Sequence, residues 1–474
     1  MHNLSNKVNL NTSSELNKNK VIRKKFIDSI YESNINKKDY FLISSTIILM
    51  LISIFFIIFF NKEIEIWHTK KIQTWWGATF NYLGIILLIT KLSFILYLFY
   101  LYTKYKAVKD IPSENLPTCT VIVPAYNEGK LVFNTLLSLA DSDYPTEKLE
   151  ILAIDDGSKD DTWNWIKEAK LILGDRLSIH KQPKNMGKRH ALHWGFTTGK
   201  GEIFITVDSD SIVNDKTIRN IVSPFITNDN CGAVAGNVKV LNKKNGIIPK
   251  MLNVSFAFSF EFVRSAQSSL GSVLCTPGAL AAYKREAVLN CLDSWINQTF
   301  LGQPSAIGED RALTNMILKQ GYNVLFQKNA IVYTNTPEKY KNLYKMFIRW
   351  ERSNVRENIM MSKFAFKNFR TGTKSGTRIL LLMQWLNIIV AIPIFISVII
   401  FTFLNPILFI ATSFSGILIF SSIQMIFYAK KYKTKEALFA YVYSIFYMFG
   451  LFWITPYAIV TARKSGWLTR ELTE

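Results

Sequence analysis

The chain has 474 residues, and its hydrophobic content of 49%, with 14% aromatic residues, excludes a globally disordered protein. Its formal net charge is +21, but the lysines and arginines flank apolar segments and no nucleic-acid-binding motif is present, so no nucleic-acid partner is expected. The preference of basic residues for the cytoplasmic ends of membrane spans accounts for most of this charge.

Two apolar segments follow a polar arm that is rich in Asn and Lys. The arm, residues 1–40, is too long and too polar to lead a cleaved secretory signal, so we expect a basic cytoplasmic arm before a retained anchor. Phe41–Phe60 carries no charge and has the length of one bilayer crossing. A second span near Phe80–Tyr102 completes a pair of transmembrane helices over residues 41–103. Its Lys91 either snorkels to an edge or faces a protein-lined pathway.

Residues 112–340 alternate short apolar runs with amphipathic stretches, which predicts an α/β layer fold. The apolar runs lie at residues 118–123, 151–154, 177–180 and 203–207. Continuous runs of this kind are typical of parallel strands that are buried on both faces. Because ligands bind at the carboxyl ends of such strands, the polar residues that follow the runs are the candidate site.

Acidic pairs follow two of these runs. Asp155 and Asp156 come after the second run, and Asp208 and Asp210 after the fourth. Carboxylate oxygens are the ligands that Mg²⁺ and Mn²⁺ prefer, so the acidic pairs are typical of a cation that binds a diphosphate. Taken alone, Asp208 and Asp210 are also compatible with a cap of the next helix, and Asp155 and Asp156 with a surface turn.

Three further features complete the candidate site. Gly187-Lys188-Arg189 opens a predicted helix, where backbone N–H groups and two cations are available to a phosphate. Glu309-Asp310 precedes a helix expected to begin near Arg311. Arg349-Trp350 lies in a basic, aromatic stretch, within residues 341–375, that is predicted to form amphipathic helices at the membrane surface.

The region from residue 376 to 462 is almost entirely apolar and is predicted to form two to three transmembrane or re-entrant helices. Pro406 divides its first part into two helices, because proline interrupts the helical hydrogen-bond ladder. With three full crossings in this region, the basic tail, residues 463–474, would lie on the other side of the membrane from the basic run that begins at Lys430. Both basic segments are expected on the cytoplasmic side. One segment is therefore expected to be interfacial or re-entrant, and Ala437–Val460 contains Gly450 and Pro456.

The four cysteines have no spacing of a metal site, and all lie in the predicted cytoplasmic domain. We expect free thiols at Cys119, Cys231, Cys275 and Cys291.

The motifs occur in an order that resembles a known enzyme family. The series VPAYNE, IDDGSKDDT, GKRHAL, VDSDS, GAVAGNVKV, GED and RW covers most of residues 118–361 and is similar to the processive family 2 glycosyltransferases of membranes. The residues around Arg349-Trp350 resemble the branch of hyaluronan synthases, nodulation chitin-oligosaccharide synthases and poly-N-acetylglucosamine synthases. The resemblance implies a GT-A-type, Rossmann-like α/β domain on the cytoplasmic side, inserted between α-helical transmembrane segments of the cell or plasma membrane.

The resemblance also implies roles for individual residues. It implies that Asp310 is the catalytic base and that Asp208 and Asp210 are the ligands of Mg²⁺ or Mn²⁺. It also implies that Asp208 contacts the donor sugar-nucleotide. The substrate-binding residues implied in this way are Tyr126, Glu128, Asp155, Asp156, Lys188, Arg189, Asp208, Glu309, Arg349, Trp350, Trp467 and Arg470. Trp467 and Arg470 enter through Gly466-Trp467-Leu468-Thr469-Arg470, which is similar to the gating segment of related synthases. The strand and turn Cys275–Arg285 resembles the family's acceptor-site lining.

One position departs from the family pattern. Where the family has Gln-x-x-Arg-Trp, Met346 stands in place of the glutamine, which puts acceptor affinity and processivity in doubt.

The sequence thus predicts an inverting membrane glycosyltransferase that takes a UDP-sugar, for which we favour UDP-N-acetylglucosamine, and extends and exports a polysaccharide. The alternative is the transfer of one sugar to a lipid carrier or membrane lipid. A catalytically silent scaffold with the same fold is a third reading, and Met346 is its only support.

Overall fold

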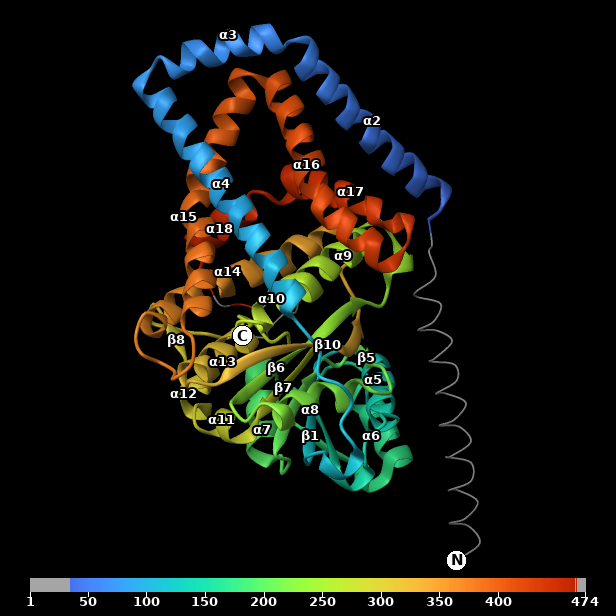
Figure 1. The fold of residues 1–474 in the computed structure, drawn as a ribbon. Helices are drawn as coiled ribbons and strands as arrows, with labels where there is room; N and C mark the ends of the chain where they lie inside the picture. The colour runs from blue at the N-terminus through green and yellow to red at the C-terminus, as the bar shows by residue number, and fades with distance from the viewer. Residues whose placement is uncertain (1–34, 465, 467–474) are drawn as a thin grey trace, which may run out of the picture.

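The computed structural model describes residues 35–464 and residue 466, and Figure 1 shows a catalytic domain beneath a set of long helices. The domain is built on one mixed sheet of eight strands in the order β3-β2-β1-β4-β7-β6-β10-β5. The strands are β1 (Cys119–Ala125), β2 (Leu149–Asp155), β3 (Leu177–Lys181), β4 (Ile203–Val207), β5 (Ser211–Val213), β6 (Cys231–Val240), β7 (Leu280–Lys284) and β10 (Asn323–Thr334).

The four apolar runs of the sequence form the parallel half of this sheet. β1 pairs in parallel with β2 and β4, and β2 pairs in parallel with β3. β7 is antiparallel to both β4 and β6, while β10 runs parallel to β6 and antiparallel to β5. The carboxyl ends of β1, β2 and β4 therefore meet at one edge, where the predicted site residues follow them.

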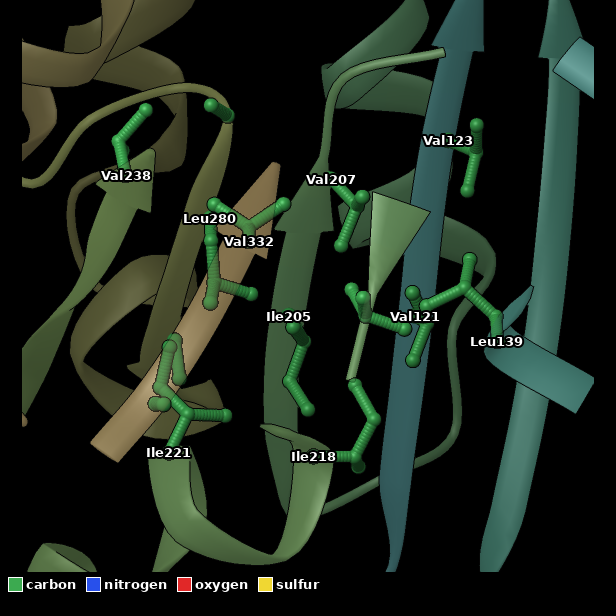
Figure 2. Packing of buried hydrophobic residues seen from close by; sticks show 14 of the residues in the cluster. Val121, Val123, Leu139, Ile205, Val207, Ile218, Ile221, Val238, Leu280 and Val332 are labelled. Atoms are coloured by element: carbon green, nitrogen blue, oxygen red, sulfur yellow. The ribbon is translucent and has the colours of Figure 1, made fainter. Parts of the chain in front are cut away.

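Helices cover both faces of the sheet. On one face, α5 (Leu131–Ala140), α6 (Thr162–Leu173) and α8 (Thr217–Thr227) pack against inward side chains such as Val121 and Ile205 (Figure 2). The other face carries α7 (Lys188–Thr198), α11 (Arg285–Leu289), α12 (Leu292–Ile296) and α13 (Glu309–Lys319). Alternate residues of β1 point to opposite faces, so Val121 and Ile122 belong to different cores. A small hairpin, β8 (Thr299–Phe300) and β9 (Gln303–Pro304), lies outside the main sheet.

Among the residues that the structure describes, four helices are long and apolar enough to cross a membrane, judged by length and composition: α2 (Lys37–Phe59), α4 (Trp75–Lys104), α15 (Ser375–Leu404) and α16 (Pro406–Tyr432). α15 ends one residue before Asn405 and α16 begins at Pro406, as the sequence predicts. The polar helix α3 (Asn61–Ile72) joins α2 to α4 at the end of the molecule farthest from the sheet (Figure 1).

A layer of further helices lies between the sheet and the four candidate membrane helices. It contains α9 (Ile247–Phe256), the π-helical turn η5 (Ala257–Val263), α10 (Arg264–Ser268) and α14 (Tyr340–Ala365). The C-terminal segment adds η6 (Lys435–Leu438), α17 (Phe439–Phe446), the π-helical turn η7 (Tyr447–Leu451) and α18 (Ile454–Val460). This last segment bends by 44° after Leu451, so that it is either a broken span or a re-entrant element.

Two ion pairs join this layer to the ends of α2 and α16, and a third joins Lys243, which precedes α9, to η6. Lys250 Nζ lies 2.5 Å from Asp39 Oδ2 at the start of α2, and Lys243 Nζ lies 3.1 Å from Glu436 Oε1 of η6. Glu261 of η5 pairs with Lys431 near the end of α16. Both partners of the first two pairs are buried, so breaking either pair from one side would leave a buried charge without its partner.

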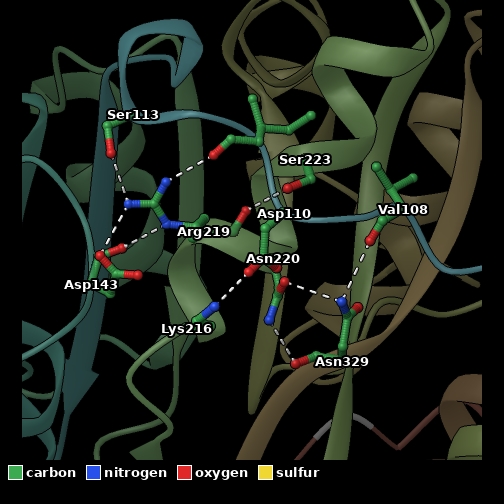
Figure 3. Close-up of polar contacts among 10 residues, drawn as sticks. Val108, Asp110, Ser113, Asp143, Lys216, Arg219, Asn220, Ser223 and Asn329 are labelled. Atoms are coloured by element: carbon green, nitrogen blue, oxygen red, sulfur yellow. Dashed lines mark hydrogen bonds and ion pairs between the residues drawn. The ribbon is translucent and has the colours of Figure 1, made fainter.

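The segment between α4 and β1 is held against the domain by α8 and β10 (Figure 3). Arg219 of α8 donates to Ile111 O at 2.8 Å, to Ser113 Oγ at 3.0 Å and to Asp143 Oδ1 at 3.0 Å. Lys216 pairs with Asp110 at 2.6 Å. These contacts fix the point at which the chain leaves α4 and enters the sheet.

Candidate active site

A cavity of about 730 Å³ opens at the carboxyl edge of the sheet and extends to the interfacial helices and the start of α15. Most of the predicted site residues line it, although they come from segments that are far apart in the chain. They are Tyr126, Glu128, Asp156, Lys188, Asp208, Asp210, Glu309, Asp310, Arg349 and Trp350. The fold therefore brings the acidic clusters and the Arg-Trp pair to one place.

The Asp156 carboxylate holds the turn that precedes α7. Its Oδ1 accepts a hydrogen bond from Met186 N at 2.9 Å, and its Oδ2 accepts one from Gly187 N at 2.8 Å. Gly187 has a φ of 92°, a conformation that glycine adopts without strain. Asp156 thus orders the wall of the cavity from which Lys188 projects.

Asp155 lies outside the cavity lining. Its Oδ1 accepts a hydrogen bond from Ser158 N at 3.0 Å, and its Oδ2 lies 3.8 Å from Lys181 Nζ. Because successive residues at a strand end point in opposite directions, Asp155 and Asp156 cannot both face one ligand directly. The geometry gives Asp155 a contact with the turn rather than with the cavity.

Lys188 bridges two acidic groups at the centre of the cavity. Its Nζ lies 2.5 Å from Asp208 Oδ1 and 3.3 Å from Glu309 Oε1. Burial alone would lower the pKa of Lys188, but the carboxylates of Asp208 and Glu309 raise it above its ordinary value. The ammonium is therefore charged and able to meet an anionic ligand.

Asp208 and Asp210 offer a donor set that fits a hard divalent cation. Both line the cavity, Asp208 directly after β4 and Asp210 directly before β5, and both supply carboxylate oxygens. Within residues 35–464 no group of three or more His, Cys, Asp or Glu side chains is arranged to hold a metal. A cation here would thus take its remaining oxygen ligands from a diphosphate and water, which is common for Mg²⁺.

Asp310 lies in the first turn of α13, which begins at Glu309, two residues earlier than the sequence suggests. Gly308, with a φ of 78°, starts the helix in the left-handed conformation and packs closely against Ser353 of α14. Asp310 Oδ1 accepts a hydrogen bond from Arg311 N at 2.7 Å, and Cys275 Sγ lies 3.6 Å from Oδ2. Burial, and then the carboxylate of Glu309, raise the pKa of Asp310.

Arg349 and Trp350 project from α14 into the same cavity. The Trp350 ring is 39% exposed and lies 5.6 Å from the Phe347 ring and 6.1 Å from the Phe256 ring. Met346, one turn earlier, also lines the cavity and is otherwise buried in the core. The position of the family's glutamine thus faces the cavity with a thioether.

Arg189 is turned away from the cavity, contrary to the prediction that it binds phosphate. Its Nη1 donates to Trp295 O at 2.7 Å and to Gln298 Oε1 at 3.1 Å, and its guanidinium lies over the Trp295 ring. It is 4% exposed. Trp467 and Arg470 lie outside the described residues.

Several residues of the cavity lining carry no signal in the sequence. Gln384 of α15 and Arg311 of α13 join across the cavity, because Arg311 Nη2 donates to the Gln384 side chain. Arg264 of α10 and Glu351 of α14 also line it, and burial raises the pKa of Glu351. Gln384 lies in an apolar run that the sequence identifies only as a membrane span. Its place in the cavity lining could therefore not be predicted from the sequence.

Three comparisons relate the chain to known proteins. The family model described as "Glycosyltransferase like family 2" matches residues 117–353. A hyaluronan synthase of Streptococcus pyogenes serotype M3 is 28% identical over 396 residues, which cover 81% of this chain and 90% of that protein. An N-acetylglucosaminyltransferase of Rhizobium meliloti is 32% identical over 255 residues, which cover 54% of this chain and 59% of that protein.

A mannosyltransferase from Pyrobaculum calidifontis, solved in complex with GDP-mannose and Mn²⁺, superposes with a TM-score of 0.50 at 19% identity and covers 80% of this chain. At that identity the likeness shows the fold alone, which is the GT-A-like mixed sheet with flanking helices. The family model spans the sheet, the cavity carboxylates and Arg349-Trp350 alike. The chain therefore belongs to the glycosyltransferase-like family 2 and is a glycosyltransferase related to hyaluronan synthases and N-acetylglucosaminyltransferases.

Proposed function

We propose that the chain transfers N-acetylglucosamine from its UDP-sugar to a growing polysaccharide, with inversion at the anomeric carbon, and exports the product through its own membrane helices. One observation carries this proposal: a single cavity runs from the strand ends, where Asp156 and Asp208 lie, to Trp350 and to Gln384 at the start of a membrane helix. Donor and acceptor ends of the reaction can thus share one continuous space.

The donor end is built from β1, β2 and β4. Asp156, Tyr126 and Glu128 line the part of the cavity suited to a nucleoside, while Lys188 and Arg349 supply cations for the diphosphate. Asp208 and Asp210 would hold Mg²⁺ or Mn²⁺, which when bound neutralises charge that develops on the leaving diphosphate. Lys188 already pairs with Asp208, so it screens that carboxylate and stays available to the phosphates.

Asp310 is the residue suited to remove the proton of the acceptor hydroxyl. Its raised pKa brings its basicity closer to neutral pH, which suits a general base. The hydrogen bond from Arg311 N fixes one carboxylate oxygen, and the other is left toward the cavity and Cys275. Attack by the deprotonated hydroxyl from the side opposite the diphosphate inverts the anomeric carbon.

The acceptor end lies against the membrane helices. Trp350 offers an exposed aromatic face on which a sugar ring can stack, and it neighbours η5 and α9. Gln384, Arg311 and Glu351 add polar groups beyond it. A polymer that leaves over Trp350 would pass directly among α14 and α15.

The ends of the helices support a cytoplasmic position for the catalytic domain. Asp39 at the start of α2 and Lys431 near the end of α16 both contact the interfacial layer, and α4 ends where the catalytic domain begins. The basic residues near these ends favour the cytoplasmic side. The bent C-terminal segment starts and ends on the same layer, through Glu436 to Lys243 and Thr461 to Arg352, which supports an interfacial or re-entrant path.

The decisive experiment uses the full chain in lipid nanodiscs with a panel of UDP-sugars. We expect UDP release that is greatest with UDP-N-acetylglucosamine, is abolished by EDTA and is restored by Mg²⁺ or Mn²⁺, and we expect a long product on size analysis. Asp208→Ala should lose release, whereas the exposed-surface variant Glu168→Gln should retain it. A product that carries a single labelled sugar on an extractable lipid would contradict polymerisation and support single transfer. The absence of UDP release from every UDP-sugar tested would overturn the proposal.

A further inference from the structure

Gly278, in the turn that precedes β7, lies against the ion pair between Lys188 and Asp208. β4 ends at Val207, which pairs with Leu280 of β7, so this turn lies beside the residues that follow β4. Gly278 lines the same cavity as Lys188 and Asp208. A Cβ atom on Gly278 would lie 2.6 Å from Lys188 Nζ, and 3.5 Å and 3.7 Å from the two carboxylate oxygens of Asp208. The side chain that such an atom would displace is therefore Lys188.

The backbone conformation of Gly278 does not by itself require glycine. Its φ is not positive, unlike that of Gly187 or Gly308, so an alanine can adopt the same backbone without strain. Glycine also serves where the backbone must approach another group closely. At Gly278 the close approach is the one to the Lys188 ammonium.

The turn is fixed on both sides of Gly278. Thr276 N donates to Thr314 Oγ1 at 3.1 Å, and the two hydroxyl oxygens, on fully buried side chains, lie 2.8 Å apart. On the other side, Leu280 N donates to Pro277 O at 3.1 Å. A side chain at position 278 would therefore be accommodated by the flexible end of Lys188, which would withdraw by roughly 1 Å to reach an ordinary contact distance.

A withdrawal of this size would disturb the bridge that Lys188 makes across the cavity. Its Nζ lies 2.5 Å from Asp208 Oδ1 and 3.3 Å from Glu309 Oε1. Hydrogen bonds weaken once the two heavy atoms are more than about 3.2 Å apart, so an ammonium that moves away from Gly278 cannot keep both contacts at these distances. The absence of a side chain at Gly278 thus determines where the ammonium lies.

We propose that Gly278 is a positioning residue for the donor: because it has no side chain, the Lys188 ammonium stays between Asp208 and Glu309, where it meets the diphosphate of the nucleotide. This rests on the proposed function, in which Lys188 supplies a cation for that diphosphate. Gly278 acts through Lys188. Its part of the turn before β7 therefore serves the donor end, in addition to the acceptor-site lining that the sequence resemblance implies for Cys275–Arg285.

The test measures the binding of UDP alone to the full chain in lipid nanodiscs, by titration calorimetry with Mg²⁺ present. UDP carries the diphosphate but no sugar, so its affinity does not depend on the donor sugar or on the acceptor. We expect Gly278→Ala to bind UDP about tenfold more weakly than the wild type, which is the lower end of what one hydrogen bond to a charged group contributes. Gly372→Ala is the matched control and should leave the affinity unchanged, because a Cβ there meets no atom within 4 Å.

A double-mutant cycle distinguishes an effect through Lys188 from a structural effect of the added methyl group. Lys188→Met removes the ammonium, ends one atom short of the position of Nζ, and should itself weaken UDP binding. In this background there is room for the alanine, so Gly278→Ala should change the affinity by less than about twofold. A structural effect would instead give the same additional loss in both backgrounds.

An unchanged affinity of Gly278→Ala for UDP would overturn the inference, and so would an equal loss in the wild-type and Lys188→Met backgrounds. Thermal unfolding identifies a variant that has lost its fold. If Gly278→Ala were unfolded in both backgrounds, the methyl group would disturb more than the end of Lys188, and the inference would also fail. A wild type that binds no UDP would overturn the proposed UDP-sugar donor and this inference with it.

Discussion

Two adjacent residues of α7 show how position on a helix separates similar side chains. Lys188 and Arg189 are both cations at a helix start, and the sequence assigns both to a phosphate. Successive helical residues point about 100° apart, so Lys188 reaches Asp208 while Arg189 reaches Trp295 on the other side. The sequence is enough to predict that one of these two side chains faces inward. Which of them does so depends on the position of α12, which lies more than 100 residues further along the chain.

Asp310→Asn should lower transfer by about 10²- to 10⁴-fold, because an amide cannot take the acceptor proton. The pKa of Asp310 is raised in the wild type. As the pH is lowered, activity should therefore begin to fall at a higher pH than it would with an ordinary aspartate as the base. The base must be ionised, so activity is present above its pKa and lost below it. Initial-rate profiles against pH measure both effects, with the exposed Asp175→Asn as control. A variant that keeps a tenth of the activity would contradict the role.

Met346→Gln should lengthen the product, because it returns a hydrogen-bonding group to the cavity beside Trp350. The side chain is largely buried, and an unsatisfied amide there would cost about 1 to 3 kcal/mol of stability. Product sizing by gel filtration reports the first effect and thermal unfolding the second. Met346→Leu conserves the volume and should change neither. A shorter product from the glutamine variant would show that the thioether itself serves processivity.

At the scale of elements, local patterns predicted the strands that precede the site and the break at Pro406. Apolar runs bounded by polar turns are short-range signals, and β1 to β4 follow them closely. The antiparallel placement of β7 and β5 was not predictable in this way, because it depends on pairing between distant segments. The same limit applies to Lys250 of α9 and Glu261 of η5, because their ion-pair partners lie in the distant helices α2 and α16.

Lys243→Met should destabilise the protein by about 3 to 5 kcal/mol, because it leaves the buried carboxylate of Glu436 without its cation. The double variant Lys243→Met/Glu436→Gln should recover most of that loss, since it removes both charges and keeps an acceptor for Tyr428. Thermal unfolding of the detergent-solubilised chain measures the difference. Equal losses in the single and double variants would mean that packing, not charge, stabilises this contact.

On the scale of the whole molecule, catalysis and membrane anchoring are parts of one packed structure. Core residues of α14 and of the bent C-terminal segment join the same hydrophobic cluster as the sheet, among them Leu343, Leu451 and Ile454. α2, α4, α15 and α16 all have one end at the interfacial layer, while α3 lies at the opposite end (Figure 1). A membrane between these two ends places α3 and the catalytic domain on opposite sides.

This arrangement predicts the labelling of two reporter variants, each with one introduced cysteine, in intact cells. Lys70→Cys in α3 should react with a membrane-impermeant maleimide, and Lys433→Cys after α16 should react only once the cells are permeabilised. Cys119, Cys231 and Cys291 are buried, so a Cys275→Ser background limits native labelling. The reverse pattern would place the catalytic domain outside the cell, and labelling of both reporters in intact cells would mean that α4, α15 and α16 do not all cross the membrane.

The ion pairs of the interfacial layer also impose an order on synthesis. Lys250 meets Asp39, made 211 residues earlier, but Lys243 requires Glu436, which lies 193 residues further on. At ribosomal speeds that interval is about 10 to 40 s. In the later part of that interval, once β10 has been made, a nascent chain has all the strands of the sheet but an interfacial layer in which Lys243 lacks the Glu436 carboxylate. Completion of the interfacial layer therefore depends on the segment that contains Glu436, so a chain that stops before Glu436 would have its sheet but would leave the Lys243 ammonium without this carboxylate.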